Sequence, residues 1–118
     1  MTSTPKPRGV ARIWRGRTAA AMADEYGDYL YEKGVRKLEQ LGARGVQMFR
    51  EDRGAESEFM VISYWDTLEA MTSWAGSDPR RIRHLERDAE MLVELPQGVQ
   101  ILEVLSNNRA LADAMRKS

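Results

Sequence analysis

Hydrophobic positions are densest between Phe59 and Trp65, where both alternations of an extended strand are apolar. One alternation holds Phe59, Val61 and Trp65, and the other holds Met60, Ile62 and Tyr64. A strand of this kind is typical of a sheet that is covered on both faces. We therefore expect this strand to lie at the centre of the fold.

Two helices are predicted to follow this strand. Asp66 is the expected N-cap of the first, with Glu69 placed to complete a capping box. Its apolar stripe holds Leu68, Met71, Trp74 and Ala75. Gly76 ends it, and Asp78-Pro79 begins a second helix that continues from Arg80 toward Met91, because proline suits the first helical position.

The remaining elements follow from the same patterns. Strands are predicted at Gly9–Gly16, Val46–Glu51 and Val99–Leu105, with a hairpin connection at Arg53–Glu56. A long helix, capped by Thr18, is predicted from Ala19 to Leu41, with a stripe of Met22, Tyr26, Leu30 and Leu38. Gly34 falls on this stripe, either as a tolerated glycine or to let a strand or ligand approach closely.

The element order predicts an α+β protein of ferredoxin-like βαββαβ topology, with an antiparallel sheet and helices on one face. A second copy of the chain would cover the other face, so we expect a homodimer with sheets packed face to face. Residues 9–106 form the domain, residues 1–8 are expected to be a disordered polar tail, and residues 107–118 a C-terminal helical tail.

Composition narrows the function classes. The 118 residues carry 18 Lys plus Arg and 18 Asp plus Glu, a balance that favours neither nucleic acid nor a membrane as partner. Without a transmembrane run or a signal-peptide core, the expected location is the cytoplasm. The chain has no cysteine and one histidine, which excludes disulfides, thiolate nucleophiles and a multi-histidine metal site within one chain.

His84 is the candidate catalytic residue. Asp88 lies one turn later on the predicted helix, where its carboxylate can orient the imidazole and raise its basicity. A histidine tuned in this way can remove a phenolic or enolic proton. The alternative is a surface histidine paired with an aspartate.

Aromatic side chains are the candidate walls of a substrate pocket between helices and sheet. Trp14, Trp74 and Tyr26, the last with a hydroxyl that can hydrogen-bond, are interpreted as such walls or as core residues. Nearby arginines can bind a carboxylate or phosphate, or belong to a solvated face of mixed charge; they are Arg80, Arg81, Arg83 and Arg87.

Three stretches, VARIWRGRT, GVQMFRED and EFMVISYWDTLEAMTSWAGSDP, resemble the antibiotic-biosynthesis-monooxygenase family of dimeric α+β barrels, over roughly residues 9–105. The resemblance implies a small oxygenase that acts without a cofactor on an aromatic or polyketide-like substrate. It also leaves open a non-catalytic ligand-binding or interaction module on the same fold.

The haem-degrading branch of this superfamily is a further alternative. That branch uses a helical tryptophan and, ten residues later, a histidine that ligates iron, and Trp74 and His84 stand at this separation. It also uses an asparagine on the first strand, where this chain has Arg12, Ile13 or Trp14. This departure disfavours haem degradation, so no cofactor is expected.

Overall fold

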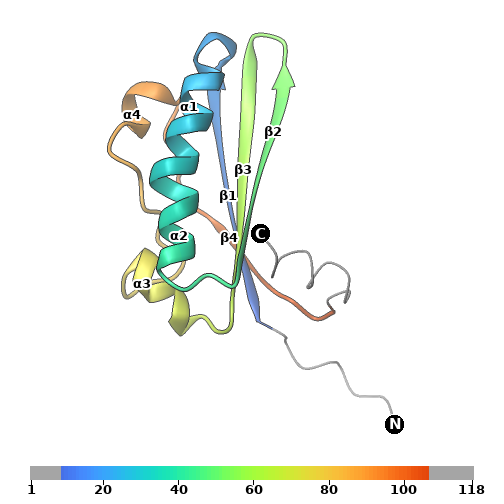
Figure 1. Cartoon of the computed structure of the whole chain (residues 1–118), viewed down its shortest axis with the longest axis vertical. Coiled ribbons are helices and arrows are strands. Elements are labelled where there is room, and N and C mark those ends of the chain that lie inside the picture. The colour runs from blue at the N-terminus through green and yellow to red at the C-terminus, as the bar shows by residue number, and fades with distance from the viewer. Residues whose placement is uncertain (1–8, 107–118) are drawn as a thin grey trace.

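The computed structural model describes residues 9–106, which form a four-stranded antiparallel sheet with helices on one face (Figure 1). The strands are β1 (Val10–Ala19), β2 (Gly45–Arg53), β3 (Glu56–Trp65) and β4 (Gln100–Glu103), in the spatial order β2-β3-β1-β4. This is the ferredoxin-like order, so the predicted fold class is confirmed. The two predicted tails, 1–8 and 107–118, lie outside the described residues.

The long helix forms as predicted but contains a change of helical type. A 3₁₀ turn (Ala20–Met22) leads into α1 (Ala23–Leu30), a π-helical turn (Tyr31–Val35) and α2 (Arg36–Gln40). The apolar stripe faces the sheet, with Tyr26, Leu30 and Leu38 buried. Thr18 does not cap this helix, because β1 extends to Ala19 and Thr18 pairs with Ser57 of β3 instead.

The connection after β3 differs from the prediction at its start. A 3₁₀ turn (Glu69–Met71) and α3 (Thr72–Ala75) form, but Asp66 is not the cap. The cap position is Leu68, and the hydroxyl oxygen of Thr67 beside it accepts a hydrogen bond from the backbone N–H of Ala70 at 3.1 Å. Asp66 instead accepts from the Arg44 guanidinium at 3.0 Å.

The predicted helix from Arg80 to Met91 is wrong for most of its length. Only α4 (Asp88–Met91) is helical, and residues 76–87 form an irregular connection. At both ends of this connection an aspartate side chain accepts a hydrogen bond from the nearby backbone. Asp78 accepts from the N–H of Arg80, and Asp88 accepts from the N–H of Leu85. Such local bonds offer the backbone an alternative to the helical ladder.

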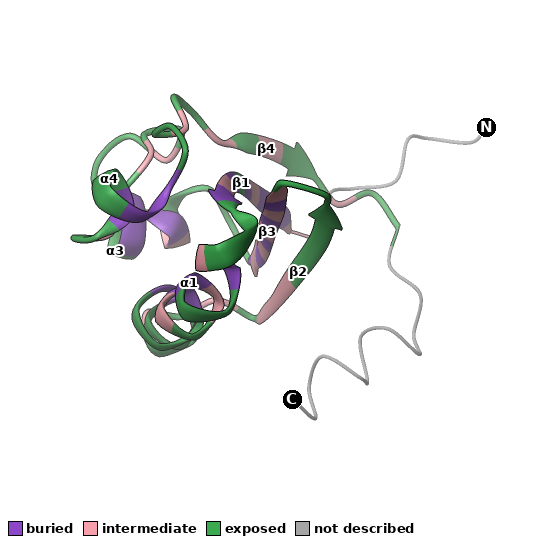
Figure 2. Cartoon of the chain, turned by 90° about the horizontal axis from the view of Figure 1, so that it is seen from above, coloured by how far each residue is buried: buried purple, intermediate pink, exposed green. Residues whose placement is uncertain are grey.

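The helices of the described residues lie on one side of the sheet, as Figure 2 shows from above. The core between the two layers is built on side chains that are almost completely buried: Tyr26, Phe59, Trp65 and Met71. The Tyr26 and Phe59 rings meet edge to face with centroids 5.5 Å apart. The described helices cover only this face, and no helix within residues 9–106 covers the opposite one.

The open face of the sheet carries apolar side chains in the middle, beside Arg15 and Gln47, and ion pairs at one end. Along β3 the helix-facing residues are buried, whereas Met60, Ile62 and Tyr64 are only partly buried (Figure 2). On the flanking strands, Phe49 pairs with Met60 and is 44% exposed, while Leu102 on β4 is 45% exposed. We call these five residues the open-face patch.

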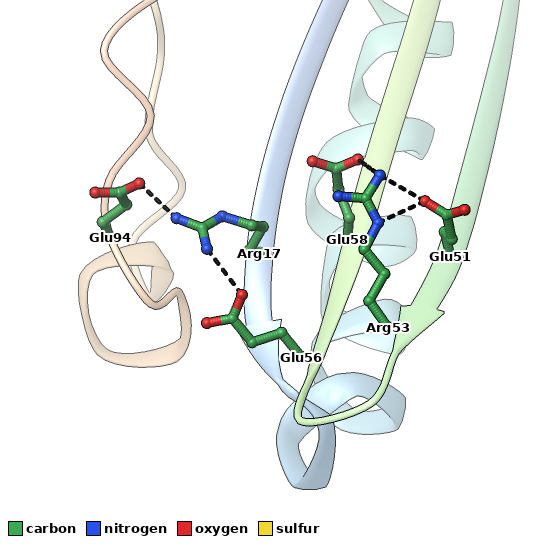
Figure 3. Close-up of polar contacts among 6 residues, drawn as sticks. All are labelled: Arg17, Glu51, Arg53, Glu56, Glu58 and Glu94. Carbon is green, nitrogen blue, oxygen red and sulfur yellow. Dashed lines mark hydrogen bonds and ion pairs between the residues drawn. The ribbon is translucent and has the colours of Figure 1, made fainter.

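Ion pairs mark the end of the sheet beside the β2–β3 hairpin (Figure 3). Arg17 contacts Glu56 at 2.8 Å and Glu94 at 2.6 Å. Arg53 contacts Glu51 at 2.6 Å and Glu58 at 3.2 Å. Exposed ion pairs of this kind add little to the free energy of unfolding. Because they occupy the end of the sheet beside the hairpin, the open-face patch is confined to the rest of the face.

Candidate functional site

A small cavity lies between the helix-facing side of the sheet and the helices that cover it. Its volume is about 30 Å³, roughly enough for one or two water-sized groups. The sheet, the long helix, α3 and the irregular connection all contribute to its lining, which consists of Arg12, Trp14, Leu30, Gly34, Leu38, Val61, Ser63, Trp74, Arg83, Leu85 and Asp88. Every layer of the fold therefore meets at this point.

Two tryptophans form aromatic walls of the cavity. The indole of Trp14 lies over Gly16, where an added Cβ would come within 2.6 Å of the ring, so the glycine makes room for it. Trp74, on α3, has the guanidinium of Arg83 stacked 4.5 Å from its ring centroid, a cation–π contact. The structure thus places both predicted wall residues at one cavity.

Arg12 is a buried guanidinium on the cavity wall. It is 4% exposed, and one terminal nitrogen donates to the carbonyl oxygen of Arg81 at 3.2 Å. Its Nε has no hydrogen-bond partner within the described chain. Burial lowers the pKa of Arg12 to about 10, so the side chain is still a cation at neutral pH.

A second unpaired donor lines the same cavity. The indole Nε1 of Trp74 is buried and has no hydrogen-bond partner among residues 9–106. Buried donors are nearly always paired with protein or ordered water in folded proteins. Two residues of the cavity lining, Arg12 and Trp74, thus carry buried donors that no described group satisfies.

Asp88 and Tyr26 form a buried hydrogen-bonded pair behind the cavity. The Tyr26 hydroxyl donates to Asp88 Oδ1 at 2.8 Å, and the backbone N–H of Leu85 donates to Oδ2 at 2.8 Å. Burial, together with the Asp88 carboxylate, raises the pKa of Tyr26. Tyr26 is not among the lining residues; it anchors Asp88, so its predicted place on the pocket wall is wrong.

His84 lies outside the cavity, exposed in a shallow surface depression that it shares with Trp74 and Arg83. The predicted pairing of His84 with Asp88 is wrong, because the two residues do not lie on one helix. Both Asp88 oxygens are occupied, by Tyr26 and by the Leu85 backbone. His84 therefore does not line the cavity, and it shares only the neighbouring depression with Trp74.

The arginines of the irregular connection take different positions. Arg83 lines the cavity and donates to the carbonyl oxygen of Trp74 at 3.3 Å. Arg81 is exposed and contributes its backbone carbonyl to Arg12. Arg87 forms surface ion pairs with Glu25 and Glu90. Of the four arginines in this connection, only Arg83 is among the residues that line the cavity.

Gly34 lies in the π-helical turn and lines the cavity. An added Cβ would lie 3.3 Å from Leu30 Cδ1 and 3.6 Å from Leu85 Cδ1, both ends of flexible side chains. We expect Gly34→Ala to raise the free energy of unfolding by up to about 1 kcal/mol, since alanine is the better helix former. Urea denaturation measures this, and a loss above 1 kcal/mol would show that the contact with Leu30 cannot relax.

A wider groove runs along the outer side of the long helix beside β2. Its volume is about 660 Å³, and it is lined by Asp24, Gly27, Asp28, Tyr31, Glu32, Met48, Phe49, Arg50 and Phe59. Arg50 is paired with Asp24 and Asp52 on the surface. The groove is therefore larger than the cavity. Its charged groups are exposed, and its lining does not include the residues with unpaired buried donors that line the cavity.

Sequence reasoning missed Arg12 and Asp88 as buried polar groups of the cavity. The alternation of β1 carried a signal for Arg12, because it shares a face with Val10 and Trp14, which are both buried. Asp88 gave no comparable signal, since its burial depends on an irregular connection that helical periodicity does not describe.

The fold is that of a small α+β domain, a ferredoxin-like antiparallel sheet with a small cavity under its helices. The family model described as antibiotic biosynthesis monooxygenase matches residues 10–81. The chain belongs to this family, which confirms the resemblance. No curated protein matches the chain.

Two further features concern the described residues. Within residues 9–106 no helix is both long and apolar enough to cross a membrane. The same part of the chain holds no group of three or more His, Cys, Asp and Glu side chains placed to hold a metal ion.

Proposed function

We propose that this protein is a small cofactor-independent oxygenase that oxidises an aromatic or polyketide-like substrate in the cavity between sheet and helices. The observation that carries the proposal is the cavity walled by Trp14 and Trp74, in a chain of the antibiotic biosynthesis monooxygenase family. Flat aromatic walls suit a flat aromatic substrate.

The cavity must widen to admit such a substrate. Its volume of about 30 Å³ is far below the roughly 300–1,000 Å³ of typical ligand pockets. Arg83 and Leu85, which lie on the irregular connection, close one side. Displacement of this connection exposes Trp74 to the substrate and brings His84 within reach of it.

The reaction needs a base and no external reductant. Removal of a proton from an anthrone gives an electron-rich enolate that reduces dioxygen. One oxygen atom enters the product as a new carbonyl, and the other leaves as water. His84 is the proposed base, acting past the Trp74 indole, while Asp88 is the carboxylate on the cavity wall.

Haem does not fit this cavity. The imidazole that would ligate iron lies outside the cavity. The strand position at which haem-degrading relatives carry asparagine is occupied by Arg12, Ile13 or Trp14. No step is therefore routed through haem.

A second candidate function is a non-catalytic ligand-binding module. The observation that favours it is the exposed position of His84, which leaves no free imidazole at the described cavity. The two candidates share the ligand site and differ only in turnover.

Oxygen uptake with anthrone as substrate separates these candidates. We expect consumption of dioxygen by the purified protein, with a rate about 10²-fold lower in His84→Ala if the imidazole is the base. Because His84 is exposed, its replacement should change stability by less than about 1 kcal/mol. Glu86→Ala, at another exposed position of the same connection, is the matched control.

The other outcomes are equally specific. Binding without oxygen uptake would support the module, and equal rates in His84→Ala and the parent would remove the imidazole from the mechanism. A Soret shift on mixing with haem, lost in His84→Ala, would favour the haem-binding alternative.

The same proposal includes a homodimer formed through the open-face patch. Its five residues are Phe49, Met60, Ile62, Tyr64 and Leu102, and they lie on the face that no described helix covers. An apolar patch bordered by charged residues is typical of a protein interface.

A further inference from the structure

We propose that the cavity binds the oxyanion of its ligand through Arg12 and Trp74. The inference deepens the proposed function and rests on it for the cavity being the ligand site. It assigns the ligand a chemical class, namely an aromatic molecule with a carboxylate or an ionised phenol or enol.

The first argument is the unmatched charge of Arg12. Its guanidinium is 4% exposed, its only described hydrogen bond goes to the neutral carbonyl of Arg81, and no described carboxylate forms an ion pair with it. A buried cation without a counterion is unfavourable, and folded proteins retain such groups where a partner or function compensates. An anion at the cavity supplies that compensation.

The second argument is independent and concerns neutral donors. Trp74 Nε1 is buried and has no partner within residues 9–106, and Trp74 lines the same cavity as Arg12. A carboxylate or enolate oxygen only accepts hydrogen bonds, so it suits the two unpaired donors of these residues.

Asp88 does not reverse this preference. It is the carboxylate on the cavity wall, but Tyr26 and the Leu85 backbone already donate to its two oxygens. Arg83, stacked on Trp74, adds a second positive charge at the opening. The charge pattern of the lining is thus two arginines against one carboxylate whose oxygens are already hydrogen-bonded.

Calorimetric titration with benzoate and benzamide tests the carboxylate arm, because the two molecules share a ring and differ in charge. We expect the parent protein to bind benzoate at least about 10-fold more tightly than it binds benzamide. Arg12→Met should abolish this preference, and Trp74→Phe, which keeps an aromatic ring but removes the donor, should reduce it several-fold. Arg44→Met, at an exposed arginine paired with Asp66, should leave it unchanged.

Titration with 4-nitrophenol tests the phenolate arm, since its ionised form absorbs at longer wavelength. Binding that lowers the pKa of the phenol, and does so only while Arg12 is present, would assign the site to an ionised phenol or enol. A preference confined to benzoate would assign it to a carboxylate. Probes that do not bind, or that bind equally to parent and Arg12→Met, would overturn the proposal.

The thermal midpoint of ligand-free Arg12→Met gives a second, ligand-independent measurement. Methionine fills similar space without charge, so the midpoint should stay unchanged or rise. A large fall would show that Arg12 serves the fold and would overturn the proposal. A different result would contradict the oxygenase proposal alone. In that case the protein would bind anions in an Arg12-dependent way but would not consume dioxygen.

Discussion

Asp88→Ala should lower the free energy of unfolding by about 3–5 kcal/mol. The Asp88 side chain is 1% exposed, and its carboxylate accepts hydrogen bonds from the Tyr26 hydroxyl and the Leu85 backbone at 2.8 Å each. Truncation leaves both donors without an acceptor, at about 1–3 kcal/mol each, and adds a cavity. Urea denaturation of the purified variant measures the loss.

Two further variants identify the source of this loss. Tyr26→Phe removes one donor and should cost about 1.5–3 kcal/mol, and the two losses should not add, because both break one contact. Asp28→Ala is the matched control, since Asp28 is exposed on the same long helix that carries Tyr26, and it should change stability by less than about 0.5 kcal/mol. Equal losses for Asp88→Ala and Asp28→Ala would contradict the buried contact.

The same contact predicts a pH dependence. The pKa of Tyr26 is raised in the folded state by burial and by Asp88, whereas an unfolded tyrosine ionises near pH 10. Above about pH 10 the unfolded chain loses this proton and the folded chain keeps it, so stability falls as pH rises. The difference in unfolding free energy between the parent and Tyr26→Phe should therefore shrink above that pH.

Regular elements with strong periodicity were predictable from the sequence. The doubly apolar alternation at Phe59–Trp65 identified the central strand, and the stripe containing Tyr26, Leu30 and Leu38 identified the long helix with its buried face. Periodicity reports burial directly, because a strand or helix repeats its contacts with the core every two or 3.6 residues.

The irregular connection between α3 and α4 was not predictable in the same way. Its residues carry helix-like spacing, but Asp78 and Asp88 bond to the nearby backbone and stop the helix. These bonds join residues only two and three positions apart, and they offer the backbone a local alternative to the helix that the apolar spacing does not reveal. The misplacement of His84 followed from this error, because the predicted pairing with Asp88 assumed one continuous helix.

The cavity could be predicted in its apolar part only. Trp14 and Trp74 were interpreted as walls or as core residues, and both line the cavity, as does Gly34. The polar part of the cavity lining depends on Arg12. A single arginine in a predicted strand does not tell which hydrogen-bond or ion-pair partners its guanidinium has in the fold. That property becomes visible only once the surrounding side chains are placed.

Ile62→Glu should convert the proposed homodimer into a monomer. Ile62 lies at the middle of the open-face patch, opposite Ile13 of β1 and Gln47 of β2. In a twofold dimer each carboxylate would be removed from water beside its symmetry mate, which should weaken association by roughly 10³-fold or more. In the monomer the same side chain faces solvent, so the fold should persist.

Sedimentation velocity at micromolar concentration measures the effect, with the parent expected at twice the mass of one chain and Ile62→Glu at the mass of one chain. Leu68→Glu is the matched control, because Leu68 is 39% exposed on the connection after β3, off the sheet face, and should leave the dimer intact. A parent protein that sediments as a stable monomer would contradict the dimer, and the open-face patch would then be solvent-exposed in the working protein. A dimeric Ile62→Glu that unfolds at the same urea concentration as the parent would instead place the interface on another surface, because a charge at the middle of a buried sheet face cannot be neutral to association.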